Sequence, residues 1–171
     1  MAVLYELMGD ARGDEVDGAL FEAIFPALHR FGGAIRPAGI DADDLVQEAL
    51  ARTLALRSLS SIENPVGYLR TAMVRIASNW ARSARRSDAR VRKAATDQEL
   101  VDVYPSDLDD LLRASASARA VLFLTVVELQ TYREAADVVG CSEPAARQMA
   151  SRALRSLRAD VGAELRPGDA S

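Results

Sequence analysis

The chain has little of what most catalytic and metal-binding sites are made from. Its 171 residues include one cysteine, Cys141, and one histidine, His29. A single cysteine excludes an internal disulfide, and together the two residues do not supply the ligands of an ordinary structural zinc site. His29 has no partner at a recognisable catalytic spacing, so we predict a structural role for it. The sequence therefore predicts no metal site, no cofactor and no catalytic residue, and hence a protein that is not an enzyme.

Aromatic residues and long apolar runs are also scarce. Aromatics make up 5% of the chain and apolar residues 49%, so the core must be built mainly from leucine, isoleucine, valine and alanine. No apolar run approaches the roughly 20 residues that span a bilayer. The N-terminus carries Glu6 and Asp10 where a signal peptide would be basic. We therefore expect a cytoplasmic protein with one domain or two small ones.

Charge is plentiful but unevenly distributed. The net charge is −4, which by itself argues against nucleic-acid binding. Residues 1–64 sum to −6, residues 65–93 to +7, residues 94–128 to −5, and residues 129–171 to zero. This alternation predicts that different segments face different partners. The positive segment favours a polyanion such as a phosphate backbone.

The positive segment has the pattern of one long helix, NPVGYLRTAMVRIASNWARSARRSDARVRK. Asn64 suits an N-cap and Pro65 suits the first turn. Helical spacing predicts a buried stripe formed by Leu69, Met73, Ile76 and Trp80. Trp80 continues this stripe, which favours a core position over stacking on a base. Arginines follow it, and a run of that kind is a solvated face unless other segments support an anion-binding role.

Two helical patterns precede this segment. The first starts near Asp14, and Pro26 interrupts it and should kink it; its apolar stripe comprises Val16, Leu20, Ile24, Leu28 and Phe31. The second follows a candidate N-cap, Asp41. Its buried side is expected to include Leu45, Val46, Ala49, Leu50 and Leu56, and its polar face Asp44, Gln47, Glu48 and Arg52. The two carboxylates on that face lack a histidine or a second carboxylate helix, so we interpret them as surface residues.

The C-terminal part contains three further helical patterns. Residues 94–107, which precede these patterns, are acidic and include Pro105, so we predict that they form a flexible linker. Residues 111–129 contain an apolar run typical of a buried helix. Thr131 and Glu134 then fit a capping box, and a turn at Gly140 precedes a basic helix that Ser142 can cap and that runs to about residue 158. Helix, glycine turn and basic helix are typical of a helix-turn-helix.

Three of these segments resemble, in order, parts of bacterial sigma factors of the extracytoplasmic-function type. DADDLVQEAL at 41–50 resembles the region 2 segment that docks on the clamp helices of the polymerase β′ subunit. PVGYLRTAMVRIASNWARSARR at 65–86 resembles the helix that melts and reads the minus-ten element. TYREAADVVGCSEPAARQMASRALRSLR at 131–158 resembles the region 4 helix-turn-helix that reads the minus-thirty-five element. The resemblance covers roughly residues 15–93 and 108–160.

The chain departs from the family pattern in three places. Residues 114–117 are Ala-Ser-Ala-Ser where a Leu-Pro start to region 4 is usual. Residues 145–148 are Ala-Ala-Arg-Gln where the recognition helix commonly has Thr-Val-Lys-Ser. Ser83 stands where an aspartate is common. These differences bear on promoter sequence rather than on the class of protein.

The resemblance implies an all-α fold of two small helical domains. Region 2 corresponds to 14–93, the linker to 94–107 and the region 4 helix-turn-helix to 108–160. Polymerase docking is expected at Asp44, Gln47, Glu48 and Arg52. Contact with the minus-ten element is expected at Ser61, Arg75, Asn79, Arg82 and Arg86, with the loop 58–63 holding a base out of the stack. The minus-thirty-five element is expected at Tyr132, Ser142, Arg147, Gln148, Ser151, Arg152 and Arg155.

The implied partners are core RNA polymerase, through its β′ clamp and β flap, and promoter DNA, with an anti-sigma factor left open. No cofactor is implied. One alternative is a helix-turn-helix regulator that acts alone, with residues 14–93 as its ligand or dimer domain. Such a ligand domain more often has an aromatic-lined pocket, and aromatics are few here. An enzyme of unfamiliar helical type is the other alternative, and no nucleophile–base set, phosphate loop or metal cluster supports it.

Overall fold

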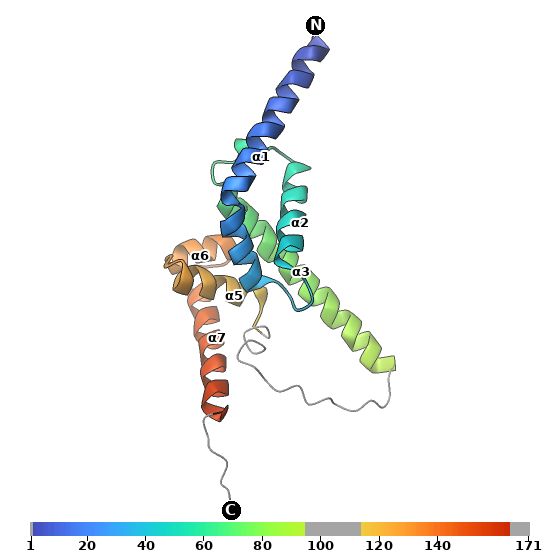
Figure 1. The fold of residues 1–171 in the computed structure, drawn as a ribbon. Helices are drawn as coiled ribbons and strands as arrows, with labels where there is room; N and C mark the ends of the chain where they lie inside the picture. The colour runs from blue at the N-terminus through green and yellow to red at the C-terminus, as the bar shows by residue number, and fades with distance from the viewer. Residues whose placement is uncertain (1, 95–113, 165–171) are drawn as a thin grey trace, which may run out of the picture.

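The computed structural model describes the backbone of residues 2–94 and 114–164, and the side chains of residues 15–86 and 114–155. Every regular element in this part is helical (Figure 1), which confirms the all-α prediction. The elements are α1 (Ala2–Ile35), α2 (Ala42–Leu54), a short 3₁₀ turn η1 (Leu59–Ser61), α3 (Pro65–Ala94), α5 (Ala116–Leu122), a π-helical turn η2 (Phe123–Val127), α6 (Tyr132–Val139) and α7 (Glu143–Glu164). The predicted linker, apart from its first residue, lies outside the described residues.

Helix α1 is longer than the sequence pattern indicated. It begins at Ala2 rather than near Asp14, and it continues through Pro26 without a break. Leu28 and Phe31 are fully buried as expected, but Val16 is 53% exposed. Each step of four residues turns 40° past a full helical turn, so the proposed stripe rotates by about 120° between Val16 and Leu28. The N-terminal end of the stripe therefore faces solvent.

Helices α1, α2 and α3 pack against one another to form the N-terminal bundle. Leu45, Val46 and Ala49 of α2 are buried, as predicted. Leu56 is 76% exposed, contrary to prediction, because α2 ends at Leu54 and Leu56 lies beyond the bundle. Asp41 is the N-cap residue of α2, although its side chain accepts no capping hydrogen bond from the described first turn.

The predicted stripe of α3 is buried over its first three members only. Leu69, Met73 and Ile76 lie in the core, whereas Trp80 is partly exposed at its edge. In Figure 1, α3 runs past the end at which α2 begins, so the bundle no longer covers α3 on that side. Asn64 caps the helix as predicted, since its Oδ1 accepts the N–H of Gly67 at 2.9 Å.

The C-terminal helices pack through small side chains. Ala135 and Ala136 of α6 are buried with the alanines of α7, and these residues let the two helix backbones approach closely. The segment predicted as one helix over 111–129 is instead α5 followed by η2, in which Glu128 N–H donates to the Phe123 carbonyl at 3.1 Å. Residues 111–113 of that prediction lie outside the described part.

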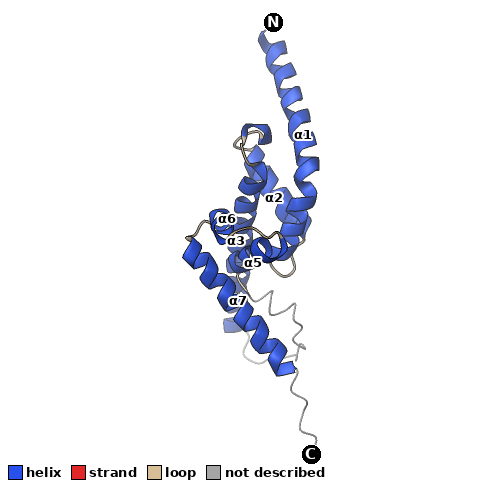
Figure 2. Cartoon of the chain, turned by 90° about the vertical axis from the view of Figure 1, so that its left-hand side faces the viewer, coloured by secondary structure: helices blue, strands red, loops and turns tan. Residues whose placement is uncertain are grey.

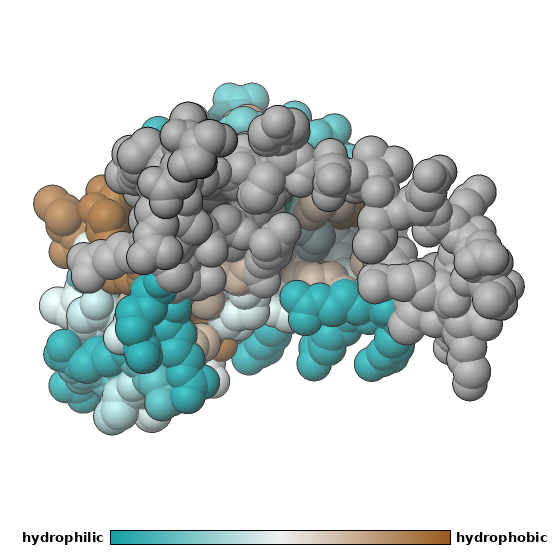
Figure 3. All heavy atoms as spheres, turned by 90° about the horizontal axis from the view of Figure 1, so that it is seen from below, coloured by the Kyte–Doolittle hydropathy of each residue, from teal (hydrophilic) through white to brown (hydrophobic). Residues whose placement is uncertain are grey.

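The π-helical turn leaves apolar side chains in solvent. The exposed fractions are 61% for Val126, 65% for Val127 and 83% for Leu129. Beside them is a hollow of about 240 Å³ whose lining includes Phe123 and Leu154. Figure 3, seen from below, shows hydrophobic surface at the left-hand edge, which is the side on which α5 and α6 lie in Figure 1.

The two sets of helices meet in a seam, the contact of α5, η2 and α6 with α1 and α3 (Figure 2). At its centre the Phe31 and Phe123 rings pack edge to face, with centroids 5.8 Å apart. The buried Arg119 guanidinium donates from Nη2 to the carbonyls of Ile35 at 2.6 Å and Arg36 at 2.9 Å. One continuous hydrophobic core therefore extends across the seam.

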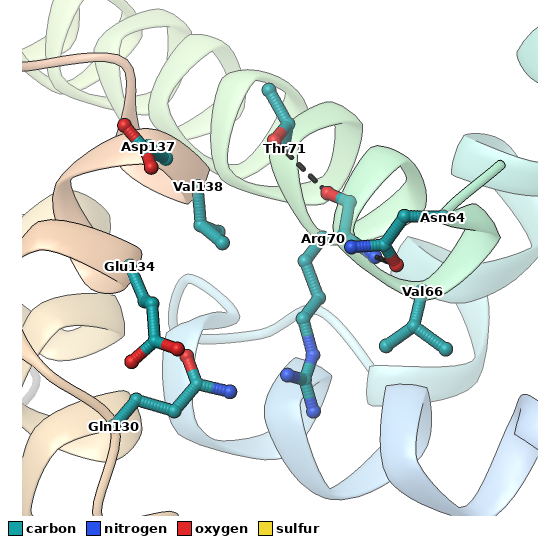
Figure 4. A pocket seen from close by; sticks show the side chains of 9 residues that line it. Asn64, Val66, Arg70, Thr71, Gln130, Glu134, Asp137 and Val138 are labelled. Carbon is teal, nitrogen blue, oxygen red and sulfur yellow. Dashed lines mark hydrogen bonds between the residues drawn. The ribbon is translucent and has the colours of Figure 1, made fainter.

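An ion pair and a cavity lie farther along the same seam. Arg70 of α3 contacts Glu128 at 2.6 Å, with 7% of the Arg70 side chain exposed. Beside it is a cavity of about 440 Å³, which Figure 4 shows between Asn64 and Thr71 on one side and Glu134 and Asp137 on the other. No described helix is both long and apolar enough to cross a membrane.

Candidate nucleic-acid interface

The predicted docking residues gather around Trp80. Asp44 and Gln47 are exposed on α2, and with Glu48 they line an open hollow of about 500 Å³ that also includes Trp80. Glu48 forms an exposed ion pair of 2.7 Å with Arg52, the fourth predicted docking residue. Within the described chain, no three histidine, cysteine, aspartate or glutamate side chains are grouped to hold a metal ion. Trp80 lines this hollow, whereas its helical spacing predicted a place in the buried stripe.

The predicted minus-ten residues of α3 share one exposed face. Their helical positions fall within about 60° of one another, and the face consists of Arg75, Asn79, Arg82 and Arg86. Arg82 Nη2 donates to Asn79 Oδ1, so these two side chains act as one polar group. At about 1.5 Å of rise per residue, Arg86 lies roughly 30 Å along the helix from its first turn. From Arg75 to Arg86 the face extends about 16 Å along α3, enough to follow several nucleotides of one strand.

Ser61 lies in the loop 58–63, between α2 and α3. Its hydroxyl donates to the Ser58 carbonyl at 2.7 Å, and its side chain is exposed. Leu59 is fully buried and Ile62 packs at the edge of the core, so both residues anchor the loop. The Asp17 carboxylate of α1 accepts the N–H groups of Leu59 and Ser60, each at 2.8 Å. No feature of the sequence pointed to this contact.

The helix-turn-helix has the local structure that the sequence predicted. Thr131 and Glu134 form the capping box, with Glu134 Oε2 accepting the Thr131 N–H at 2.7 Å. Hydrogen bonds from the hydroxyl and N–H of Thr131 lower the pKa of Glu134. Gly140 ends α6 at φ 74°, a left-handed conformation that favours glycine. Ser142 Oγ accepts the Ala145 N–H at 3.4 Å at the start of α7.

Two predicted minus-thirty-five residues contact each other. The Arg147 guanidinium lies 4.6 Å from the centroid of the Tyr132 ring and 2.7 Å from a carboxylate oxygen of Glu143. The other members of this set on α7 are also exposed, and they are Gln148, Ser151, Arg152 and Arg155. Ala146, one of the atypical residues, is fully buried. It therefore belongs to the packing of α7 rather than to the exposed face.

The matched family agrees with this geometry. The family model of Sigma-70 region 2 matches residues 20–87. This range contains α2, the loop 58–63 and the arginine face of α3. Over these residues the chain is similar to the sigma-70 family. The curated relative described next is of the extracytoplasmic-function type.

Two relatives extend the comparison. The chain is 30% identical over 161 residues to the ECF RNA polymerase sigma factor SigJ of Mycobacterium tuberculosis (strain ATCC 25618 / H37Rv), covering 82% of this chain and 48% of SigJ. It thus spans about half the length of that curated relative. The solved structure of the sigma factor RpoE in complex with the anti-sigma factor NepR from Bartonella quintana matches with a TM-score of 0.56 and 24% identity, over 88% of this chain and 98% of that chain. At that identity the likeness concerns the fold.

Proposed function

We propose that the chain is a sigma-70 family member, a non-enzymatic initiation factor of the extracytoplasmic-function type, which binds core RNA polymerase in the cytoplasm and directs it to promoters. The observation that carries the proposal is the pairing of two surfaces on adjacent helices. An acidic hollow lies on α2 beside Trp80, and an arginine face continues along α3. A stand-alone regulator would have no use for a separate acidic docking surface, so the proposal favours the sigma factor over that alternative.

The acidic hollow is proposed to dock on the β′ clamp. The carboxylates of Asp44 and Glu48 suit a basic surface, and the exposed part of the Trp80 ring can receive a cationic side chain on its face. Arg52 holds Glu48 in place through their ion pair. In this arrangement Trp80 belongs to the docking surface rather than to the strand-binding face.

The arginine face and the loop 58–63 are proposed to handle the opened minus-ten strand, within a region 2 domain at 14–93. Unstacking a base costs a few kcal/mol, so the protein must hold it once it is out. Asn79 and Arg82 lie off the buried stripe, and their exposed side chains, which are hydrogen-bonded to each other, can contact the strand. Ser61 lies near the first turn of α3, so the opened DNA strand would run along α3 from the arginine face toward Ser61.

The helix-turn-helix, within a region 4 domain at 108–160, is proposed to contact the minus-thirty-five element through the exposed face of α7. Near it, Val126, Val127 and Leu129 form an exposed apolar patch, a feature that can mark the contact with a protein partner. We assign this patch to the β flap. An anti-sigma factor is a further proposed partner, because the Bartonella quintana relative was solved with one.

Reversing the charge of the hollow tests the docking role and the function together. Asp44→Arg with Glu48→Arg should weaken binding to core polymerase by roughly tenfold or more, because like charges then meet across the contact. Affinity is measured by pull-down or fluorescence titration, and function by transcription in vitro across a promoter library. Wild type should support promoter-specific transcription, and the variant should need more protein to do so.

The matched control is Glu22→Arg, which changes an exposed acidic side chain on α1. It should leave core binding within about twofold, since surface substitutions away from a contact have small effects. Equal affinity of wild type and the double variant would remove the docking role of α2. Tight binding of the protein to duplex DNA without polymerase, and no transcription with it, would favour the stand-alone regulator.

Arg147 tests the upstream contact. Arg147→Ala should reduce transcription from promoters with a minus-thirty-five element by about five- to 150-fold, because a base-edge contact is worth roughly 1–3 kcal/mol. Glu143→Gln is the control, since it breaks the 2.7 Å ion pair but leaves the arginine in place. It should not reduce transcription. If scrambling the element affects wild type and Arg147→Ala alike, the assignment is wrong.

A further inference from the structure

We infer that Asp17 is a positioning residue for promoter opening: it holds the loop 58–63 where Ser60 and Ser61 can meet an unstacked base. The inference rests on the proposed function, because the loop has this task only in a chain that opens promoters. It adds a residue of α1 to machinery that the family resemblance places on the loop and α3.

The contact is specific in its geometry. Asp17 is 8% exposed, and its two carboxylate oxygens are divided between two N–H groups. Oδ2 accepts from Leu59 at 2.8 Å and Oδ1 from Ser60 at 2.8 Å. The bond partners are 42 and 43 residues apart in the chain, so the contact fixes the loop to a different helix rather than to itself. An ionised carboxylate hydrogen-bonded in this way makes stronger bonds than a neutral group does.

The loop is thereby fixed at both its buried and its polar atoms. The Leu59 side chain is fully buried, while the N–H groups of residues 59 and 60 are held by Asp17. The side chains of Ser60 and Ser61 remain exposed. Burial alone would raise the pKa of Asp17, but the hydrogen bonds from Ser60 and Leu59 outweigh it and lower the pKa. Asp17 therefore stays an acceptor at neutral pH.

The other end of the loop is fixed to α3. Asn64 caps that helix through its bond to the Gly67 N–H, and a Cβ on Gly67 would lie 2.7 Å from the Asn64 side-chain nitrogen. Only glycine fits there without displacing the cap. Asp17 therefore holds residues 59 and 60 of the loop, and Asn64 holds the junction between the loop and α3. A site whose supporting contacts are already formed does not have to order itself when the base arrives.

The test uses the full chain bound to core polymerase and a promoter that the wild-type holoenzyme selects from a library. Asp17→Asn keeps the side-chain shape but replaces one acceptor oxygen with an N–H₂ group, so it cannot accept both loop N–H groups. Each minus-ten base of a single-stranded non-template oligonucleotide is replaced in turn by an abasic position. For wild type we expect one position where base removal weakens binding by about tenfold. For Asp17→Asn, removal of the same base should weaken oligonucleotide binding by less than about twofold.

Two controls separate positioning from stability. Glu15→Gln removes an exposed carboxylate from the same helix and should retain the wild-type base dependence. Thermal midpoint and core-polymerase affinity are measured for every variant. If Asp17→Asn does not fold, Asp17→Glu takes its place, because it keeps the charge but moves the accepting oxygens. Faster amide hydrogen exchange at residues 59 and 60 is the expected direct sign of a released loop.

The outcomes are distinct. Loss of base dependence with core affinity unchanged supports the inference. Base dependence retained in Asp17→Asn, despite faster exchange at the two amides, overturns it. An equal loss of all binding, in proportion to the unfolded fraction, also overturns it, because Asp17 then serves only the fold. A wild-type holoenzyme that selects no promoter contradicts the proposed function instead, and this is seen before any variant is tested.

Discussion

Phe31→Ala should lower the free energy of unfolding by about 3–5 kcal/mol, the usual cost of deleting a buried aromatic ring. Phe31 is fully buried, packs edge to face on Phe123 and lies 5.2 Å from the Arg70 guanidinium. The substitution therefore leaves a cavity where α1, α3 and η2 meet. For a chain of this length the thermal midpoint should fall by roughly 10 °C or more. Calorimetry and urea denaturation measure both quantities.

Phe21→Ala is the matched control. Phe21 is on the same helix but only partly buried, at the edge of the core, so its loss should cost clearly less, under about 2 kcal/mol. Similar losses of free energy of unfolding in the two variants would mean that packing at Phe31 stabilises the fold no more than packing at the edge of the core does. A small effect of Phe31→Ala would contradict the continuous core across the seam.

Arg119→Met should also destabilise the protein, by about 2–4 kcal/mol. The arginine donates to the carbonyls of Ile35, Arg36 and Ala114, and a buried acceptor left without a donor costs about 1–3 kcal/mol. Methionine replaces the apolar stem but none of the hydrogen bonds. Arg119→Lys keeps the charge, yet an ammonium cannot match the planar fork of a guanidinium, so it should recover only part of the loss. Urea denaturation gives the free energy of unfolding for each.

Arg133→Met provides the comparison, since Arg133 is exposed on α6. Its effect should stay within about 0.5 kcal/mol. If Arg119→Met were equally mild, the bonds from Arg119 to the end of α1 would contribute nothing to the seam. A loss of stability in Arg119→Met that Arg119→Lys recovers fully would assign the effect to charge alone.

Local features of this fold were predictable because their causes lie within a few residues. The cap at Asn64, the capping box of Thr131 and Glu134, and the left-handed Gly140 each depend on neighbours in the chain. The exposed faces of α2 and α7 follow from helical spacing in the same way. These elements also carry most of the candidate site, whereas the partners assigned to it came from the resemblance.

Long-range contacts could not be predicted, since no local pattern marks them. Trp80 continues a helical period, but the period does not reveal where the neighbouring helix begins. Arg70 counted toward the positive segment, yet it is 6% exposed and pairs with Glu128, 58 residues away in sequence. Arg119 and Asp17 were likewise unremarked charges until the fold brought them to carbonyls and N–H groups 84 and 42 residues distant.

The seam has a consequence for how far the two proposed DNA-reading surfaces can reach. Elements centred near −10 and −35 lie roughly 80 Å apart on duplex DNA, at about 34 Å per helical turn. In the form with Arg70 and Glu128 2.6 Å apart, the two halves are held against each other. If both elements are read with the halves apart, polymerase must supply the free energy that separates them. Each 1.4 kcal/mol of seam stability then lowers the apparent affinity for polymerase by up to tenfold. Side chains that touch neither DNA nor polymerase, such as Phe31 and Arg119, would thereby set how strongly a promoter is used.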